Sequence, residues 1–204
     1  PTPPIVLIHG LASSPLELQY LARNLRQAGH TVHLLTLDHY TIGQGQAAQA
    51  YDAHRWVADA RAQIQALAAQ AGGPLIVGGL CIGAVMALRL AQLEPQRISA
   101  VMALSTALHY DGWGNPWFTP LLPLARVFTF SQAWRIAEKS PFGVKDVRMR
   151  AWLEKQMQRL GQSAAGAASL RIKDLLQARQ LGSMVLRDLP QLTMPILLLH
   201  ARQD

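Results

Sequence analysis

The chain has 204 residues, of which 50% are apolar and 15% are charged, a composition that excludes an intrinsically disordered protein and suffices for a substantial core. No apolar run is long enough to cross a bilayer and no secretory leader pattern opens the chain, so we expect a cytoplasmic protein without an integral membrane segment. One cysteine excludes an internal disulfide, which leaves a reducing cytosol as the default compartment.

The net charge of +7 belongs to one segment. Residues 126–187 hold twelve Lys and Arg and four Asp and Glu, a balance of +8, and the rest of the chain has seven and eight, a balance of −1. These cations follow amphipathic helical patterns without a nucleic-acid-binding motif, so we expect no nucleic-acid partner. They either steer anionic substrates or form solvated outer faces, and the sequence leaves both interpretations open.

The first strand is predicted over residues 5–8, an aliphatic and β-branched run of the kind buried in parallel sheets. A helix is expected over residues 16–28, with Ser14 as its N-cap and Glu17 in the third helical position. A second strand follows over residues 31–37.

A long helix over residues 47–71 precedes the stretch that carries the chemistry. The next strand, over residues 75–80, runs into the pattern Gly79-x-Cys81-x-Gly83, and an amphipathic helix follows. This is the nucleophile-elbow pattern with Cys where Ser is usual. Its glycines let strand and helix pass close to a strained turn, and a helix N-terminus favours a thiolate and a developing oxyanion. The alternative is that Cys81 is a small buried hydrophobe.

Two more strands are predicted over residues 98–104 and 194–200. Between them, residues 107–189 differ in composition, with short helical stretches between prolines and longer ones near residues 147–160 and 167–181. Alternating helices and buried strands predict an α/β fold with a mostly parallel sheet flanked by helices. Ligands of such sheets bind beyond the carboxyl ends of the strands.

Several chemical groups are predicted at those carboxyl ends: Cys81, the His9-Gly10-Leu11 turn and Asp204. With these motifs the chain resembles the α/β-hydrolase superfamily, and within it bacterial carboxylesterases and the serine-aminopeptidase (monoacylglycerol-lipase-like) hydrolases. The matching pieces are residues 8–15, Trp56 with Asp59, residues 79–83 and residues 195–204.

The resemblance implies three parts: a first section of the hydrolase core at residues 1–106, a helical lid at 107–189, and a core strand leading to the triad acid at 190–204. It implies Cys81 as nucleophile, the backbone N–H groups of Leu11 and Ile82 as oxyanion hole, and Asp204 as triad acid. Supporting positions would be His9, Gly10, Gly79 and Gly83 in the motifs, with Trp56 and Asp59 in structural roles.

Other residues leave alternatives open. Asp111, after the fourth strand, is a rival for the acid. His109, Trp113 and Trp117 are candidates for the wall of an acyl pocket, against ordinary loop residues or a small core of the lid.

The sequence departs from the family pattern in two ways. The base of these families is a His after one further strand, and the chain ends before that strand. We therefore expect a fragment of a longer protein. In the fragment, the last strand of the sheet would have an unpaired edge. The second departure is Cys as nucleophile, which dienelactone hydrolases and polyhydroxyalkanoate synthases also use on this fold.

The predicted function is cleavage of a carboxylic ester or thioester through a Cys-His-Asp mechanism. Acyl transfer and non-catalytic binding on the same fold are the alternatives. We expect a small-molecule acyl ester or thioester as substrate, no cofactor and no metal, and the oligomeric state is left open.

Overall fold

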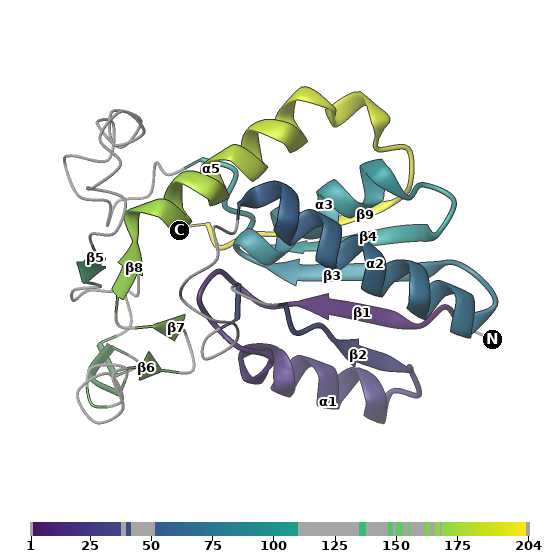
Figure 1. Cartoon of the computed structure of the whole chain (residues 1–204). Coiled ribbons are helices and arrows are strands. Elements are labelled where there is room, and N and C mark those ends of the chain that lie inside the picture. The colour runs from purple at the N-terminus through teal and green to yellow at the C-terminus, as the bar shows by residue number, and fades with distance from the viewer. Residues whose placement is uncertain are drawn as a thin grey trace.

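Five parallel strands form the central sheet in the computed structural model of the chain (Figure 1). The structure describes residues 2–37, 40–41, 52–109, 135–137, 147–148, 150–152, 155, 162–163, 166–167 and 169–202. The strands are β1 (Ile5–Ile8), β2 (Val32–Leu34), β3 (Leu75–Leu80), β4 (Ile98–Leu104) and β9 (Ile196–Leu199), in the spatial order β2-β1-β3-β4-β9. Every neighbouring pair is parallel, which confirms the predicted fold class. The five predicted strands are all present, although β2 spans less than half of the range 31–37.

Helices cover both faces of this sheet. Their bounds are η1 (Pro15–Leu18), α1 (Gln19–Gln27), α2 (Ala53–Ala71), α3 (Ile82–Leu93), α5 (Ile172–Arg187) and η4 (Leu189–Gln191). One apolar cluster joins α2, α3 and α5 to the sheet, and a second joins α1 to the opposite face. Figure 1 shows the two sides, with α1 below the strands and α2, α3 and α5 above them.

Four short strands belong to the segment that we assigned to the lid. β5 (Arg135–Ala137) pairs with β8 (Ser169–Arg171), and β6 (Gln162–Ser163) pairs with β7 (Gly166–Ala167), both antiparallel. They lie beyond the carboxyl ends of β1 and β3 (Figure 1). The helix predicted over residues 167–181 is therefore wrong at both ends, because it begins at Ile172 and continues to Arg187. The division of the chain into core and lid stays a prediction.

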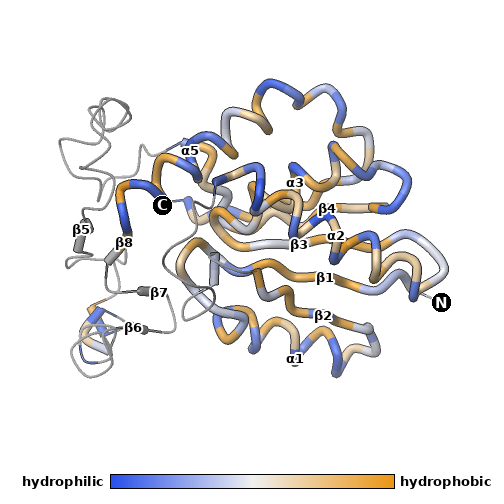
Figure 2. The backbone as a smooth tube through the Cα atoms, in the orientation of Figure 1, coloured by the Kyte–Doolittle hydropathy of each residue, from blue (hydrophilic) through white to orange (hydrophobic). Residues whose placement is uncertain are grey.

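The strand β1 is buried along its whole length, and its alternate residues serve the two apolar clusters. Val6 and Ile8 pack with α2 and α3, whereas Ile5 and Leu7 pack with α1. Figure 2 shows the hydrophobic colour along β1. An aliphatic run without alternation is what a strand between two helical layers requires.

The helix α3 is buried on nearly every side, whereas the sequence predicted an amphipathic helix. Ten of its twelve residues are buried, and Arg89 and Leu93 are the half-buried ones. The reason is α5, which packs on the side of α3 that faces away from the sheet. Arg89 of α3 meets Asp188 at the end of α5 in an ion pair of 2.6 Å. A helix enclosed between a sheet and two other helices needs apolar residues all round.

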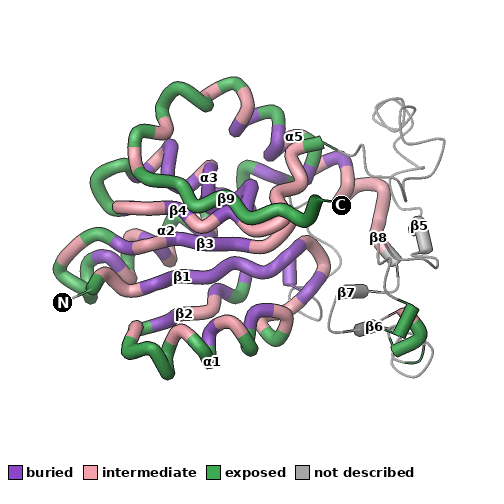
Figure 3. Tube along the Cα trace, turned by 180° about the vertical axis from the view of Figure 1, so that it is seen from behind, coloured by how far each residue is buried: buried purple, intermediate pink, exposed green. Residues whose placement is uncertain are grey.

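The strand β9 is exposed, although its sequence is as apolar as that of β1. Ile196, Leu197, Leu198 and Leu199 are between 40% and 64% exposed. Figure 3 shows β9 in the exposed colour along one edge of the sheet, beside a partly buried β4. Within the residues that the structure describes, nothing pairs with its outer edge. In the same described ranges, no helix is long and apolar enough to span a membrane.

Glu94, just after α3, ties this helix to α2. Its side chain is 2% exposed and accepts hydrogen bonds from Arg61 at 2.5 Å, Arg97 at 2.6 Å and Gln65 at 2.7 Å. Burial alone would raise the pKa of Glu94, but these hydrogen bonds outweigh it and hold the pKa below the ordinary 4.5. A lowered pKa in the folded state adds stability above about pH 4.5, and that stability is lost as the pH falls further.

We therefore expect Glu94→Gln to lower the free energy of unfolding at pH 7 by about 2 kcal/mol, since the bonds to two cations weaken. The deficit against wild type should shrink as the pH falls from about 4.5 toward the lowered pKa of the folded state. Urea titrations at pH 7 and pH 3.5 measure both. Asp59→Asn is the control, because the Asp59–Arg55 pair is 4.0 Å long with Arg55 65% exposed, and should cost less than about 0.5 kcal/mol. Equal losses for the two variants would contradict the prediction.

Candidate active site

Cys81 lies at the turn between β3 and α3, as the elbow pattern predicts. Its backbone has φ 58° and ψ −118°, a conformation that costs a residue with a side chain on the order of 1–3 kcal/mol. The turn is held by a hydrogen bond of 2.9 Å from Cys81 N–H to Leu104 O, and Cys81 O accepts from the N–H of Ala84 at 3.1 Å. The cysteine is thus fixed between the ends of two neighbouring strands, at the N-terminus of a buried helix.

The two elbow glycines are required by close backbone contacts. A Cβ at Gly79 would lie 2.1 Å from Gly83 O, and a Cβ at Gly83 would lie 2.2 Å from Ile8 O and 2.4 Å from His9 O. Real Cβ atoms do not approach backbone atoms so closely. The first turn of α3 therefore lies directly on the end of β1, which brings Cys81 to the loop that follows β1.

The loop after β1 reaches the cysteine at Gly10. A Cβ at Gly10 would lie 3.7 Å from Cys81 Cβ. The carboxylate of Glu17 accepts a hydrogen bond of 2.7 Å from Gly10 N–H. Ser14 is the N-cap residue of η1, as predicted, but its side chain makes no capping hydrogen bond, and Glu17 bonds to this loop.

His9 is buried, 1% exposed, and both of its ring nitrogens are engaged. Nδ1 lies 2.7 Å from Gly10 O, which can only accept, so Nδ1 carries the proton. Nε2 lies 2.7 Å from Thr41 Oγ1 and accepts the hydroxyl proton, while Thr41 Oγ1 accepts from Leu37 N–H at 3.1 Å. Burial lowers the pKa of His9, and the bond to Gly10 opposes this only in part. His9 is a neutral support of the loop, as the sequence predicted for its motif.

Tyr40 holds the same loop from the other side. Its hydroxyl donates to His9 O at 2.8 Å, its backbone O accepts from Ala12 N–H at 3.2 Å, and its ring lies 5.2 Å from the His9 ring. Trp56 of α2 meets Tyr40 edge-on at 5.4 Å and is 1% exposed. Trp56 thus has the packing role expected of it.

Two backbone N–H groups near Cys81 make no hydrogen bond in the described ranges. In the described ranges, neither Leu11 N–H nor Ile82 N–H has a hydrogen-bond acceptor. Ile82 follows Cys81 directly and Leu11 follows Gly10, which touches Cys81. These are the two donors that we predicted for an oxyanion hole, and that role stays a prediction.

Strained backbone gathers at this end of the sheet. Among the described residues other than glycine, positive φ occurs at Ala12, Cys81 and Ser105. They follow β1, β3 and β4, three neighbouring strands of the sheet. Such strain is costly and concentrates at functional sites, so the carboxyl end of this sheet is the candidate site on backbone evidence alone.

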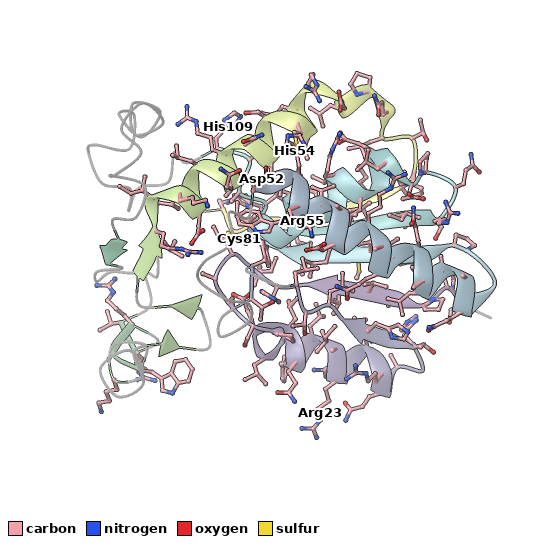
Figure 4. The ribbon with its side chains drawn as sticks, in the orientation of Figure 1. Arg23, Asp52, His54, Arg55, Cys81 and His109 are labelled. Carbon is pink, nitrogen blue, oxygen red and sulfur yellow. The ribbon has the colours of Figure 1, made fainter. Side chains whose placement is uncertain are left out.

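Several predicted site residues lie outside the described ranges: Asp204, Asp111, Trp113 and Trp117. His109 is described and exposed, and Figure 4 shows it at the same end of the molecule as Cys81, Asp52 and His54, whereas Arg23 lies on the outer side of α1. Among the described residues, no group of three His, Cys, Asp or Glu side chains could hold a metal ion.

Sequence reasoning missed Tyr40 and Thr41 as supports of the loop. Both residues bond to His9 from positions about thirty residues further along the chain, and such contacts leave no local pattern in the sequence. Glu17 was expected in the third helical position, and its bond to Gly10 N–H was not predicted.

The model of one protein family, the serine aminopeptidase, S33, family, matches residues 1–204. No curated protein sequence matches the chain.

Many solved structures share the fold. A soluble variant of monoglyceride lipase from Saccharomyces cerevisiae, in complex with a substrate analog, superposes with a TM-score of 0.75 at 16% identity, covering 99% of this chain and 69% of the lipase. One of two metagenome-derived lipolytic enzymes superposes with a TM-score of 0.68 at 20% identity, covering 97% of this chain and 71% of that enzyme. The monoacylglycerol lipase of Paleococcus ferrophilus superposes with a TM-score of 0.66 at 18% identity, covering 96% of this chain and 73% of the lipase. At these identities the likeness shows the α/β-hydrolase fold.

The close contact of Gly83 with β1 predicts that the protein does not tolerate a side chain at this position. We expect Gly83→Ala to destabilise the protein by at least about 3 kcal/mol, because its Cβ would meet backbone oxygens that cannot move aside. Gly73→Ala is the matched control, since a Cβ there meets nothing within 4 Å and Gly73 has no positive φ. Thermal unfolding of both variants tests this, and an equal melting temperature for the two would refute the close packing of α3 on β1.

Proposed function

The chain belongs to the serine aminopeptidase, S33, family, and on this premise we propose that it cleaves carboxylic esters through an acyl intermediate on Cys81. The observation that carries the proposal is the elbow itself. Cys81 sits in strained backbone at the start of a buried helix, against Gly10, with two N–H groups beside it that have no acceptor in the described ranges. A nucleophile next to two such donors is the arrangement that acyl transfer to a side chain requires.

The proposed reaction has two halves. In the first, the Cys81 thiolate attacks the acyl carbon, the carbonyl oxygen becomes an oxyanion held by the N–H groups of Leu11 and Ile82, and the C–O bond to the alcohol breaks. A His protonates the leaving alcohol. In the second half, the same His takes a proton from water, the hydroxide attacks the thioester, and the acid leaves as the C–S bond breaks.

His9 is not the base of this proposal, because it is neutral and both of its ring nitrogens are engaged. We propose that the base lies beyond residue 204, steered by Asp204, with Asp111 as the alternative acid. The solved structures named above are longer than this chain, which covers 69–73% of each of them.

Lipid-like esters are the proposed substrate class. One solved neighbour is a monoglyceride lipase with a substrate analog bound, and another is a monoacylglycerol lipase. We propose that the full-length protein acts on neutral esters of short to medium acyl chains. Thioesters are the alternative, because a thiol nucleophile exchanges acyl groups with another thiol at little cost.

We expect Cys81→Ala to lower kcat on p-nitrophenyl esters by about 1000-fold or more, since the bond-forming atom is lost. Cys81→Ser should keep part of the activity, because a His–Asp pair also activates a hydroxyl. Rapid quenching with intact-mass measurement should show one added acyl group on the wild type and none on Cys81→Ala. Circular dichroism of both variants checks that folding is intact.

Three outcomes separate the candidates. Undiminished hydrolysis by Cys81→Ala would place the nucleophile elsewhere. Acylation of Cys81 that water releases slowly and an added alcohol or thiol releases fast would assign acyl transfer. An absence of both acylation and turnover in the full-length protein would favour a binding protein on this fold.

A further inference from the structure

Glu17 turns its carboxylate inward, toward the loop that touches the cysteine. Its Oε2 accepts a hydrogen bond of 2.7 Å from Gly10 N–H, seven residues earlier in the chain. A Cβ at Gly10 would lie 3.3 Å and 3.6 Å from the two carboxylate oxygens and 3.7 Å from Cys81 Cβ. Gly10 is thus in close contact with both the Glu17 carboxylate and Cys81.

The two peptide groups of Gly10 are fixed by different partners. Glu17 holds the N–H, and the carbonyl oxygen accepts from His9 Nδ1 at 2.7 Å and from Ser13 N–H at 3.3 Å. In a trans peptide the C=O and the following N–H point in opposite directions. With Gly10 O held toward His9 and Ser13, Leu11 N–H points away from them.

We propose that Glu17 is a positioning residue, which fixes Gly10 so that Leu11 N–H keeps the direction needed to stabilise an oxyanion on a substrate bound at Cys81. This inference rests on the proposed function. Releasing Gly10 N–H would leave only the carbonyl side of Gly10 held, and a glycine has enough backbone freedom to change its φ and ψ under that weaker restraint. Donor geometry would then have to be restored in each catalytic cycle, at a cost to the rate.

Glu17 supports the proposed reaction through its hydrogen bond to Gly10 N–H, and its negative charge does not. A hydrogen bond from N–H to a carboxylate is stronger than one to a neutral acceptor. Burial raises the pKa of Glu17, and the bond from Gly10 N–H opposes that rise. A negative charge close to a thiolate or an oxyanion would disfavour both, so its electrostatic effect on the reaction is adverse.

Two substitutions separate these effects. Glu17→Gln keeps the length of the side chain and an acceptor oxygen but removes the charge. Glu17→Met keeps the length and removes the acceptor. Gln19→Met, on the exposed surface of α1, is the matched control for losing a polar side chain to methionine.

The measurements are kcat and KM for p-nitrophenyl butyrate, the melting temperature, and the rate of Cys81 alkylation by iodoacetamide, all on the full-length protein. Alkylation needs the thiolate but forms no oxyanion. We expect Glu17→Met to lower kcat by about 10- to 100-fold with KM and the alkylation rate within about threefold of wild type. Glu17→Gln should stay within about fivefold of the wild-type kcat, and Gln19→Met should change nothing.

Two results would overturn the positioning role: a kcat of Glu17→Met within about threefold of wild type, or a loss in Glu17→Gln as large as that in Glu17→Met. If Glu17→Met does not fold, the amide chemical shifts of Glu17→Gln, measured by NMR, test the positioning role. The weaker acceptor should move the Gly10 amide proton upfield and shift the Leu11 amide with it, and an unmoved Leu11 amide would end the proposal.

The same NMR comparison keeps the two proposals apart. A wild-type protein that neither hydrolyses esters nor acylates at Cys81 would remove the proposed function. The linked shifts of Gly10 and Leu11 would still show whether Glu17 sets the direction of that N–H.

Discussion

The close approach of α3 to the end of β1 is the constraint on which the site depends. With only hydrogen on Gly83, the first turn of the helix lies against the carbonyl oxygens of Ile8 and His9. That approach brings Cys81 against Gly10, and so joins the elbow after β3 to the loop that follows β1. A methyl group at position 83 would push α3 away from β1 and so separate Cys81 from Gly10. The arrangement of the elbow and this loop is therefore set by close contacts between backbone atoms.

The parallel sheet and the elbow could be predicted from the sequence, because both depend on patterns of neighbouring residues. Apolar runs of strand length mark β1 and β3, and Gly79, Cys81 and Gly83 mark the turn between strand and helix. The character of α3 could not be predicted from its own residues. Its apolar outer side is explained by α5, a helix that lies about ninety residues further along the chain.

The edge strand shows a different limit of sequence patterns. β9 reads as a buried strand from its four aliphatic residues, yet it is exposed in this structure. Hydrophobicity reports that a segment is suited to burial, and it does not report which segment covers it. On the face of the sheet opposite α3, the described helical cover is α1, whose cluster extends only as far as Met102 of β4 (Figure 3). The solved structures of this fold named above are longer than this chain, and the edge beside β9 is where an additional strand would pair.

The loop after β1 is held from three directions by groups with different chemistry. The Glu17 carboxylate holds Gly10 N–H, the neutral His9 ring holds Gly10 O, and the Tyr40 hydroxyl holds His9 O. Each partner comes from the core or from helix η1 and the turn near residue 40, and none belongs to residues 107–189. The three bonds therefore come from residues close in space to the end of β1, and they fix both the N–H and the C=O of Gly10. Because Gly10 also lies against Cys81, the loop and the elbow are held in one arrangement by the core of the fold.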